Sequence, residues 1–153
     1  MRKRTLRDRA FQAWWRMRRP MTLGVRGVVV NGEGRVLLLR HTYTPGWHFP
    51  GGGVEKGETC PLALLRELSE EAGVETSAAD LRLVSAHANH GFFPNDHVLV
   101  YRIDRWTPGT PTQRGEIAET GLFDPLVPPE GVSAGTRRRL GELFGGQPVS
   151  DRW

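Results

Sequence analysis

The chain has 153 residues, a net charge of +4 and one cysteine. This length predicts a single domain with a substantial core, and 38% hydrophobic residues is typical of a globular protein. The single cysteine excludes an internal disulfide, and we find neither a hydrophobic signal-peptide core nor an apolar run long enough to cross a membrane. We therefore expect a cytoplasmic protein.

Positive charge is concentrated at the N-terminus. Residues 1–19 hold eight basic residues and one acidic residue, a net charge of +7, whereas the rest of the chain carries −3. Apolar residues recur at helical spacing in this segment, and Pro20 ends the pattern. We predict a basic amphipathic helix over residues 1–20 and a separate domain over residues 21–153.

Three interpretations fit this helix. It packs on the domain through Phe11, Trp14 and Trp15 with its arginines in water, which is the ordinary outcome for a charged segment. Alternatively, it attaches to an anionic membrane surface through basic charge and interfacial tryptophan, which would place the protein at the inner face of a membrane. Contact with nucleic acid is the least favoured interpretation. A targeting presequence would have the same arginine-rich, acid-poor composition.

Two strands are predicted at the start of the domain, over residues 23–30 and 35–40, because aliphatic and β-branched residues dominate both. The sequence Asn31-Gly32-Glu33-Gly34 between them is typical of a tight turn, so we expect a hairpin. The continuous aliphatic run of the second strand predicts burial on both faces.

The stretch from Gly52 to Val74 predicts a helix with two contrasting faces. Pro61 stands where a helix would begin and Gly73 where it would end. At about 100° per residue, apolar side chains fall on one side and carboxylates on the other. The apolar face is formed by Leu62, Leu65, Leu68 and Ala72, and the carboxylate face by Glu67, Glu70 and Glu71.

The carboxylate face predicts a metal site. Three glutamates at this spacing repel one another, and a divalent cation would turn that repulsion into binding. Oxygen ligands suit Mg²⁺ or Mn²⁺. Arg66 is placed to hold one glutamate by charge-assisted hydrogen bonds, and the glycine run at 51–53 lets the backbone approach a ligand closely. The alternative is a solvated acidic helix face.

The same stretch resembles the signature of the Nudix hydrolase family, G-x5-E-x7-R-E-U-x-E-E-x-G-U, where U is a bulky aliphatic residue. Every fixed position is matched between Gly52 and Val74, with Glu58 and the Arg66-Glu67-Leu68 triplet in their places. A match of this length is far more specific than a short motif. The resemblance implies an α/β fold, namely an α/β/α sandwich around a mixed β-sheet, to which residues 1–20 would add a basic helix.

Nudix enzymes hydrolyse a pyrophosphate bond in a nucleoside diphosphate linked to another moiety, and the resemblance carries their roles to the matching residues. Mg²⁺, or Mn²⁺, would be held by the glutamates and adjacent carbonyls: Glu67, Glu70, Glu71, Gly51 and Gly52. Catalysis would depend on Glu67, Glu70 and Arg66, with Glu58 orienting the glutamates from behind. Two alternatives are a non-catalytic module that senses a nucleotide and a Nudix protein attached to a membrane surface.

Downstream of the signature we predict strands over residues 81–86 and 97–105, a Pro- and Gly-rich loop over 107–115, and a C-terminal helix over 133–144 with Arg137, Arg138 and Arg139 in water. The loop ends at Glu116. The resemblance implies that this glutamate joins the metal site or acts as the base, with Glu119 as the alternative.

A nucleotide-type small molecule is the implied substrate, and four side chains are candidates for contacting it: Arg26, Arg40, Trp47 and Phe92. The arginines could instead stand in water, Trp47 could pack in the core, and Phe92 could meet a second subunit of a homodimer. Markers that distinguish ADP-ribose, dinucleoside polyphosphate and NADH hydrolases are absent, so the sequence indicates no particular nucleotide.

Overall fold

The computed structural model describes residues 14, 17–18, 20–91, 93–113 and 115–153. The predicted helix over residues 1–20 lies almost entirely outside the described residues, as does Phe92. Within the described parts of the chain, no helix is both long and apolar enough to span a membrane.

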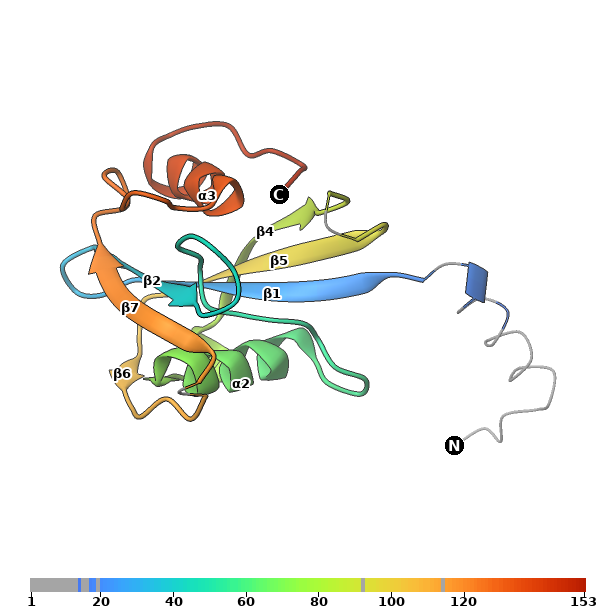
Figure 1. The fold of residues 1–153 in the computed structure, drawn as a ribbon, viewed down its shortest axis with the longest axis horizontal. Coiled ribbons are helices and arrows are strands. Elements are labelled where there is room, and N and C mark those ends of the chain that lie inside the picture. The colour runs from blue at the N-terminus through green and yellow to red at the C-terminus, as the bar shows by residue number, and fades with distance from the viewer. Residues whose placement is uncertain (1–13, 15–16, 19, 92, 114) are drawn as a thin grey trace.

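A three-stranded mixed sheet forms the centre of the fold (Figure 1). Strand β1 (Thr22–Val29) pairs in parallel with β5 (Asp96–Ile103), and β5 pairs antiparallel with β4 (Arg82–Ala88). Two smaller antiparallel pairs complete the sheets: β2 (Val36–His41) with β7 (Ile117–Phe123), and β3 (Val74–Glu75) with β6 (Thr107–Pro108).

The predicted hairpin between the first two strands is wrong. The turn itself forms, because the side chain of Asn31 accepts hydrogen bonds from the amides of Glu33 and Arg35. Beyond an isolated bridge between Val30 and Val36, however, β2 pairs with β7. The edge of β1 that a hairpin would need is occupied by the glycine-rich loop that precedes the first helix.

Helices α2 (Cys60–Ala72) and α3 (Ala134–Phe144) cover opposite faces of the strands (Figure 1). Alternate side chains of β1 and β2 point to the two faces and form two core clusters. Val25, Val29 and Leu37 pack under α2, whereas Val28, Val30, Val36 and Leu38 join the cluster that includes Leu140 of α3. The predicted burial of the second strand on both faces and the α/β/α layering are confirmed.

The ends of α2 are those that the sequence predicts. Thr59 caps its N-terminus by accepting a hydrogen bond from the Leu62 amide, Pro61 lies in the first turn, and Gly73 ends the helix at φ +60°.

The predicted faces of α2 are wrong in part. Leu62 is 55% exposed, and the buried stripe is Ala63, Leu64, Leu68 and Glu71. The pair Leu64 and Leu68 packs against β1, where a Cβ on Gly27 would lie only 3.0 Å from Leu68 Cδ2. Glu67 and Glu71 lie three residues beyond those leucines and therefore also face the sheet. The carboxylates thus flank the core stripe instead of opposing it.

Helix α3 also departs from the prediction at one residue. Arg137 and Arg138 are exposed, but Arg139 is fully buried. Its guanidinium lies 2.6 Å from Glu142 Oε1, and the Glu142 side chain is buried as well. A buried charge is tolerable only when it is paired and hydrogen-bonded, and Glu142 supplies the paired carboxylate.

Candidate active site

The glycine-rich loop runs along the free edge of β1. The Val25 amide donates to the Gly52 carbonyl and the Gly27 amide to the Pro50 carbonyl, each over 2.9 Å. Gly51 has φ +141°, and a Cβ there would overlap the backbone of Val25. A residue with a side chain is therefore excluded at this position.

Glu71 of α2 is buried beside this loop. Its Oε2 accepts a hydrogen bond of 2.8 Å from the Gly51 amide. Burial raises the pKa of the Glu71 carboxyl to about 7, the Gly51 hydrogen bond opposes that rise, and repulsion from Glu67 and Glu116 adds to it. The site concentrates negative charge where little water can screen it.

Arg66 ties three glutamates together. Its Nη1 lies 2.7 Å from Glu67 Oε1 and 3.5 Å from Glu70 Oε2, while Nε and Nη2 donate to both oxygens of Glu58. These hydrogen bonds raise the pKa of Arg66 and lower that of Glu58. Glu58 also accepts from the Glu55 amide, which fixes the carboxylate behind Arg66. This geometry is the one that the sequence predicts for Arg66 and Glu58.

Glu70 is held by a different partner, which the sequence did not indicate. Gln113 Nε2 donates to Glu70 Oε2 over 2.8 Å, and the backbone amides of Thr112 and Gln113 donate to the Glu70 carbonyl. The loop before β7 is thereby attached to α2, which brings Glu116 to the same side. A single amide residue within a polar loop carries no sequence pattern that would have marked it.

A cavity of about 640 Å³ is lined by some of these groups, but not by Glu58 or Glu70. Its wall includes five of the predicted residues with charged side chains: Arg26, Arg66, Glu67, Glu71 and Glu116. Gly51 and Gly52 also line it. The Arg26 guanidinium donates to its own strand's Val25 carbonyl, and burial lowers its pKa while Glu71 and Glu67 oppose that effect. Of the two arginines predicted to contact the substrate, Arg26 lines this cavity, called the glutamate cavity below, and Arg40 does not.

His41 is a further cavity residue that sequence reasoning missed. Its Nε2 lies 3.7 Å from Glu71 Oε1, and its Nδ1 is buried with no hydrogen-bond partner among the described residues. Burial lowers its pKa, as do the nearby charges of His48 and Arg26. Burial thus favours the neutral ring beside Glu71.

The donor set fits a hard divalent cation in its chemistry. A Cβ on Gly52 would overlap the Glu67 carboxylate, so the missing side chain leaves room for that group beside the loop. The Gly52 carbonyl already accepts from Val25, whereas no donor to the Gly51 carbonyl is found among the described residues. Gly51 is therefore the better candidate for a carbonyl ligand.

The glutamates are nevertheless held apart in this arrangement. Over the described ranges of the chain, no three His, Cys, Asp or Glu side chains are grouped as a metal site. Glu67 and Glu70 share Arg66, Glu70 also accepts a hydrogen bond from Gln113, and Glu71 accepts one from Gly51. The metal assignment for these residues stays a prediction.

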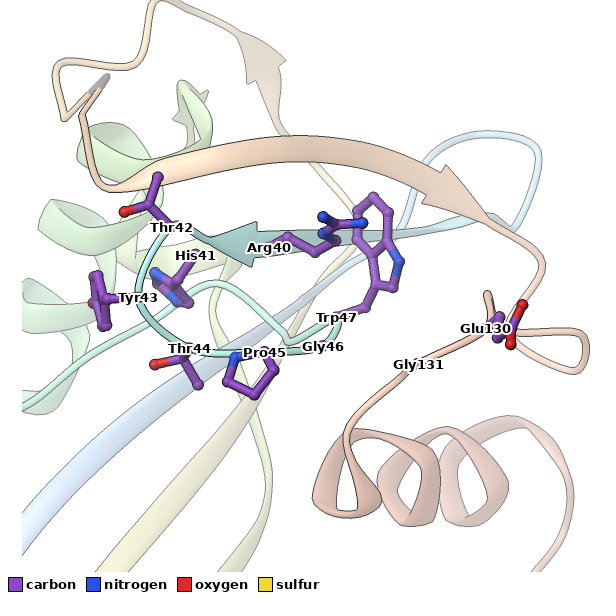
Figure 2. A pocket seen from close by; sticks show the side chains of 10 residues that line it. All are labelled: Arg40, His41, Thr42, Tyr43, Thr44, Pro45, Gly46, Trp47, Glu130 and Gly131. Atoms are coloured by element: carbon purple, nitrogen blue, oxygen red, sulfur yellow. The ribbon is translucent and has the colours of Figure 1, made fainter.

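Two other predicted substrate residues, Arg40 and Trp47, line a second cavity of about 470 Å³ (Figure 2). The guanidinium of Arg40 lies 5.7 Å from the centre of the Trp47 ring and pairs with Glu119 at 3.6 Å. Trp47 is only 7% exposed and packs edge-on against Phe123. Trp47 thus packs in the core, and its stacking on a substrate stays a prediction. Glu119, the alternative to Glu116, forms a surface ion pair.

The family model described as the NUDIX domain matches residues 20–142. An RNA pyrophosphohydrolase of Hydrogenovibrio crunogenus is 42% identical over 57 residues, covering 37% of this chain and 33% of that protein. Another, of Halorhodospira halophila, is 46% identical over 59 residues, covering 39% and 32%. The chain thus spans about a third of the length of the curated relatives it matches.

Solved structures support the fold. A MutT NUDIX hydrolase from Burkholderia pseudomallei aligns with a TM-score of 0.68 at 24% identity, covering 82% of this chain and all of that one. The ORF135 protein of E. coli aligns with a TM-score of 0.64 at 23% identity, covering 82% and 89%. Because the family model covers most of the chain and the signature lies on the helix and loop that line the glutamate cavity, the chain belongs to the Nudix hydrolase family.

Proposed function

We propose that this protein hydrolyses a pyrophosphate bond in a nucleoside diphosphate linked to another moiety, with Mg²⁺ as its cofactor and Mn²⁺ as a substitute. The observation that carries the proposal is the closure of the glycine loop against Glu67 and Glu71 within a cavity that also holds Arg26 and Glu116. Carboxylates for a cation and a guanidinium for a phosphate then lie in one enclosed space.

The residues that would hold the metal are Glu67, Glu70 and Glu71, together with the Gly51 carbonyl and Glu116. When bound, Mg²⁺ neutralises pyrophosphate charge and lowers the pKa of a coordinated water. To bind the cation, Glu70 would have to exchange its hydrogen bond from Gln113 for a metal contact. Arg66, anchored by Glu58, would keep Glu67 oriented.

Arg26 would bind a phosphate, because its guanidinium is a permanent positive charge with planar donors. Glu116 or one of the signature glutamates would accept the proton from the attacking water. Burial and the like charges of Glu67 and Glu116 oppose ionisation of Glu71 and raise its pKa.

Within this class, RNA is one candidate substrate. The relatives in the comparison are named RNA pyrophosphohydrolases, so an RNA belongs in the substrate panel beside free nucleotides. Those relatives do not favour the sensing-module alternative, since their names describe hydrolases.

The experiment is a phosphate-release screen with Mg²⁺ and Mn²⁺ over nucleoside triphosphates, sugar nucleotides, dinucleoside polyphosphates and RNA. We expect one substrate to be strongly preferred. Replacing a residue behind a metal ligand typically lowers activity by up to about 100-fold. Glu70→Gln and Glu71→Gln should each lower activity by more than this.

The matched control is Glu33→Gln, because Glu33 lies in the exposed turn after β1. It should retain full activity. Full activity in both Glu70→Gln and Glu71→Gln would contradict the site, and tight nucleotide binding without turnover would favour the sensing module.

A further inference from the structure

The segment from Ser150 to Trp153 crosses from α3 to the end of β4. The Ala88 amide donates to the Asp151 carbonyl over 2.8 Å, and the Trp153 amide donates to the Ala88 carbonyl over 2.9 Å. These bonds extend the edge of β4 beside the glutamate cavity. Trp153, in this segment, is therefore held in a defined position and lines the cavity together with Asn89.

Buried groups hold the segment in this place. Arg139 donates to the Arg152 carbonyl over 3.1 Å, and the Ser150 amide donates to Glu142 Oε1 over 2.9 Å. His87, 1% exposed, lies 2.7 Å from the Ser150 carbonyl through Nδ1. Since a carbonyl can only accept, Nδ1 carries the proton. The hydrogen bonds from these buried charged and polar side chains stabilise one conformation of the four-residue segment.

The indole of Trp153 is half-buried between core and cavity. The Arg139 guanidinium lies 5.5 Å from the ring centre, and the His87 ring packs edge-on at 6.0 Å. On α3, a Cβ added to Gly135 would overlap the indole, so the ring fits into space that glycine leaves. The ring also packs on the cluster under α3. Trp153 also lines the cavity that holds Arg26 and Glu67.

The two sets of cavity residues come from opposite layers of the fold. Glu67 and Glu71 belong to α2, whereas Trp153 is held by α3 and β4 on the other face of the sheet (Figure 1). A ligand whose phosphates lie among the glutamates would extend past the sheet edge toward Trp153 and Asn89. The Asn89 amide nitrogen donates to Asp96 Oδ2 over 2.8 Å, which leaves its oxygen to accept from a ligand.

We infer that Trp153, with Asn89 beside it, forms the subsite for the nucleobase of the substrate and is a specificity-determining residue. The inference rests on the proposed function, which supplies the nucleotide. An aromatic face attracts any base by stacking, and the free amide oxygen of Asn89 favours a base that presents an N–H donor.

The test separates base recognition from a general effect on folding. Isothermal titration with Mg²⁺ measures the binding of α,β-methylene analogues of a purine and a pyrimidine nucleotide, and of inorganic tripolyphosphate as a base-free ligand. We expect Trp153→Ala to weaken the binding of at least one nucleotide analogue about tenfold, the value of one base–aromatic stack. Binding of tripolyphosphate should not change, and Trp153→Phe should restore most of the nucleotide affinity.

The matched control is Trp106→Ala, because Trp106 packs against the other core cluster away from the glutamate cavity. It should lower stability without altering either affinity. Equal losses for nucleotide and tripolyphosphate in Trp153→Ala, or no loss for any nucleotide, would overturn the inference.

A second measurement serves if Trp153→Ala does not fold. Nucleotide binding should quench tryptophan fluorescence of the unaltered chain, and Trp153→Phe should lose that quenching; identical quenching in both would overturn the inference. Binding does not require turnover. Nucleotide binding that depends on Trp153 in a protein without hydrolysis would therefore contradict the proposed function alone.

Discussion

The Gly51 amide donates a 2.8 Å hydrogen bond to Glu71 Oε2 and so joins the glycine loop to the middle of the cavity wall. The loop is itself bonded to β1, and Glu71 belongs to α2. One short contact thus couples strand, loop and helix at the point where the carboxylates gather. Small changes in this loop should affect the site before they affect the fold.

Gly52→Ala should remove activity with little loss of stability. The added Cβ would overlap the end of the Glu67 side chain, which can swing away from the site without disturbing the backbone. We expect at least an about tenfold fall in kcat with a nearly unchanged Tm. Gly53→Ala is the control, since nothing lies within 4 Å of a Cβ there. Equal activity of the two variants would contradict the placement of Glu67.

Leu64→Ala and Leu62→Ala test which face of α2 packs on the sheet. Leu64 is fully buried under β1, so its truncation should cost about 2–5 kcal/mol of unfolding free energy. Leu62 is 55% exposed, and its truncation should cost less than about 0.5 kcal/mol. Urea unfolding measures both. The reverse order would restore the face predicted from helical spacing.

Arg139→Ala should be among the most destabilising changes in α3. It leaves the buried Glu142 carboxylate without its partner, a loss of about 3–5 kcal/mol. The exposed neighbour Arg137→Ala should change the unfolding free energy by less than about 0.5 kcal/mol.

A double replacement distinguishes the causes of that loss. Arg139→Met with Glu142→Met removes both charges and should recover much of the stability. If the double variant is no more stable than Arg139→Ala, lost packing and not the unpaired charge is responsible.

The contribution of His87 to stability should be lost as the pH falls below about 6.5. Burial lowers the pKa of His87, and Arg139 adds to that effect, so this imidazole binds fewer protons in the folded chain than in the unfolded chain. The stabilisation is complete above the unfolded-state pKa and is lost as the pH falls through the folded-state pKa. Thermal unfolding across pH 5 to 8 measures the slope, which should be shallower in His87→Gln.

The exposed His90 supplies the control for this slope. His90→Gln should leave the dependence of Tm on pH unchanged. An unaltered slope in His87→Gln would assign the acid sensitivity to other groups. One such group is His41, whose pKa is also lowered by burial.

Much of the chain was predictable because its signals are local. Pro61 and Gly73 bound α2 through preferences that act within one turn, and Arg66 contacts the adjacent Glu67 as well as Glu58, which precedes the helix. Burial of β2 on both faces follows from the apolar run alone. The spacing of Glu58, Arg66 and Glu67 carries the family signature, and with it the position of the carboxylates.

Long-range packing decided the rest. The loop bonded to β1 displaced β2 into a separate pair, which no local turn signal could reveal. Glu67 and Glu71 face the sheet because Leu64 and Leu68, rather than Leu62, meet β1. Arg139 is buried because its guanidinium pairs with Glu142 and donates a hydrogen bond to the Arg152 carbonyl. Sequence determined the elements and the chemistry of the signature; only tertiary structure decided which side chains share a cavity, because that depends on contacts between residues distant in the chain.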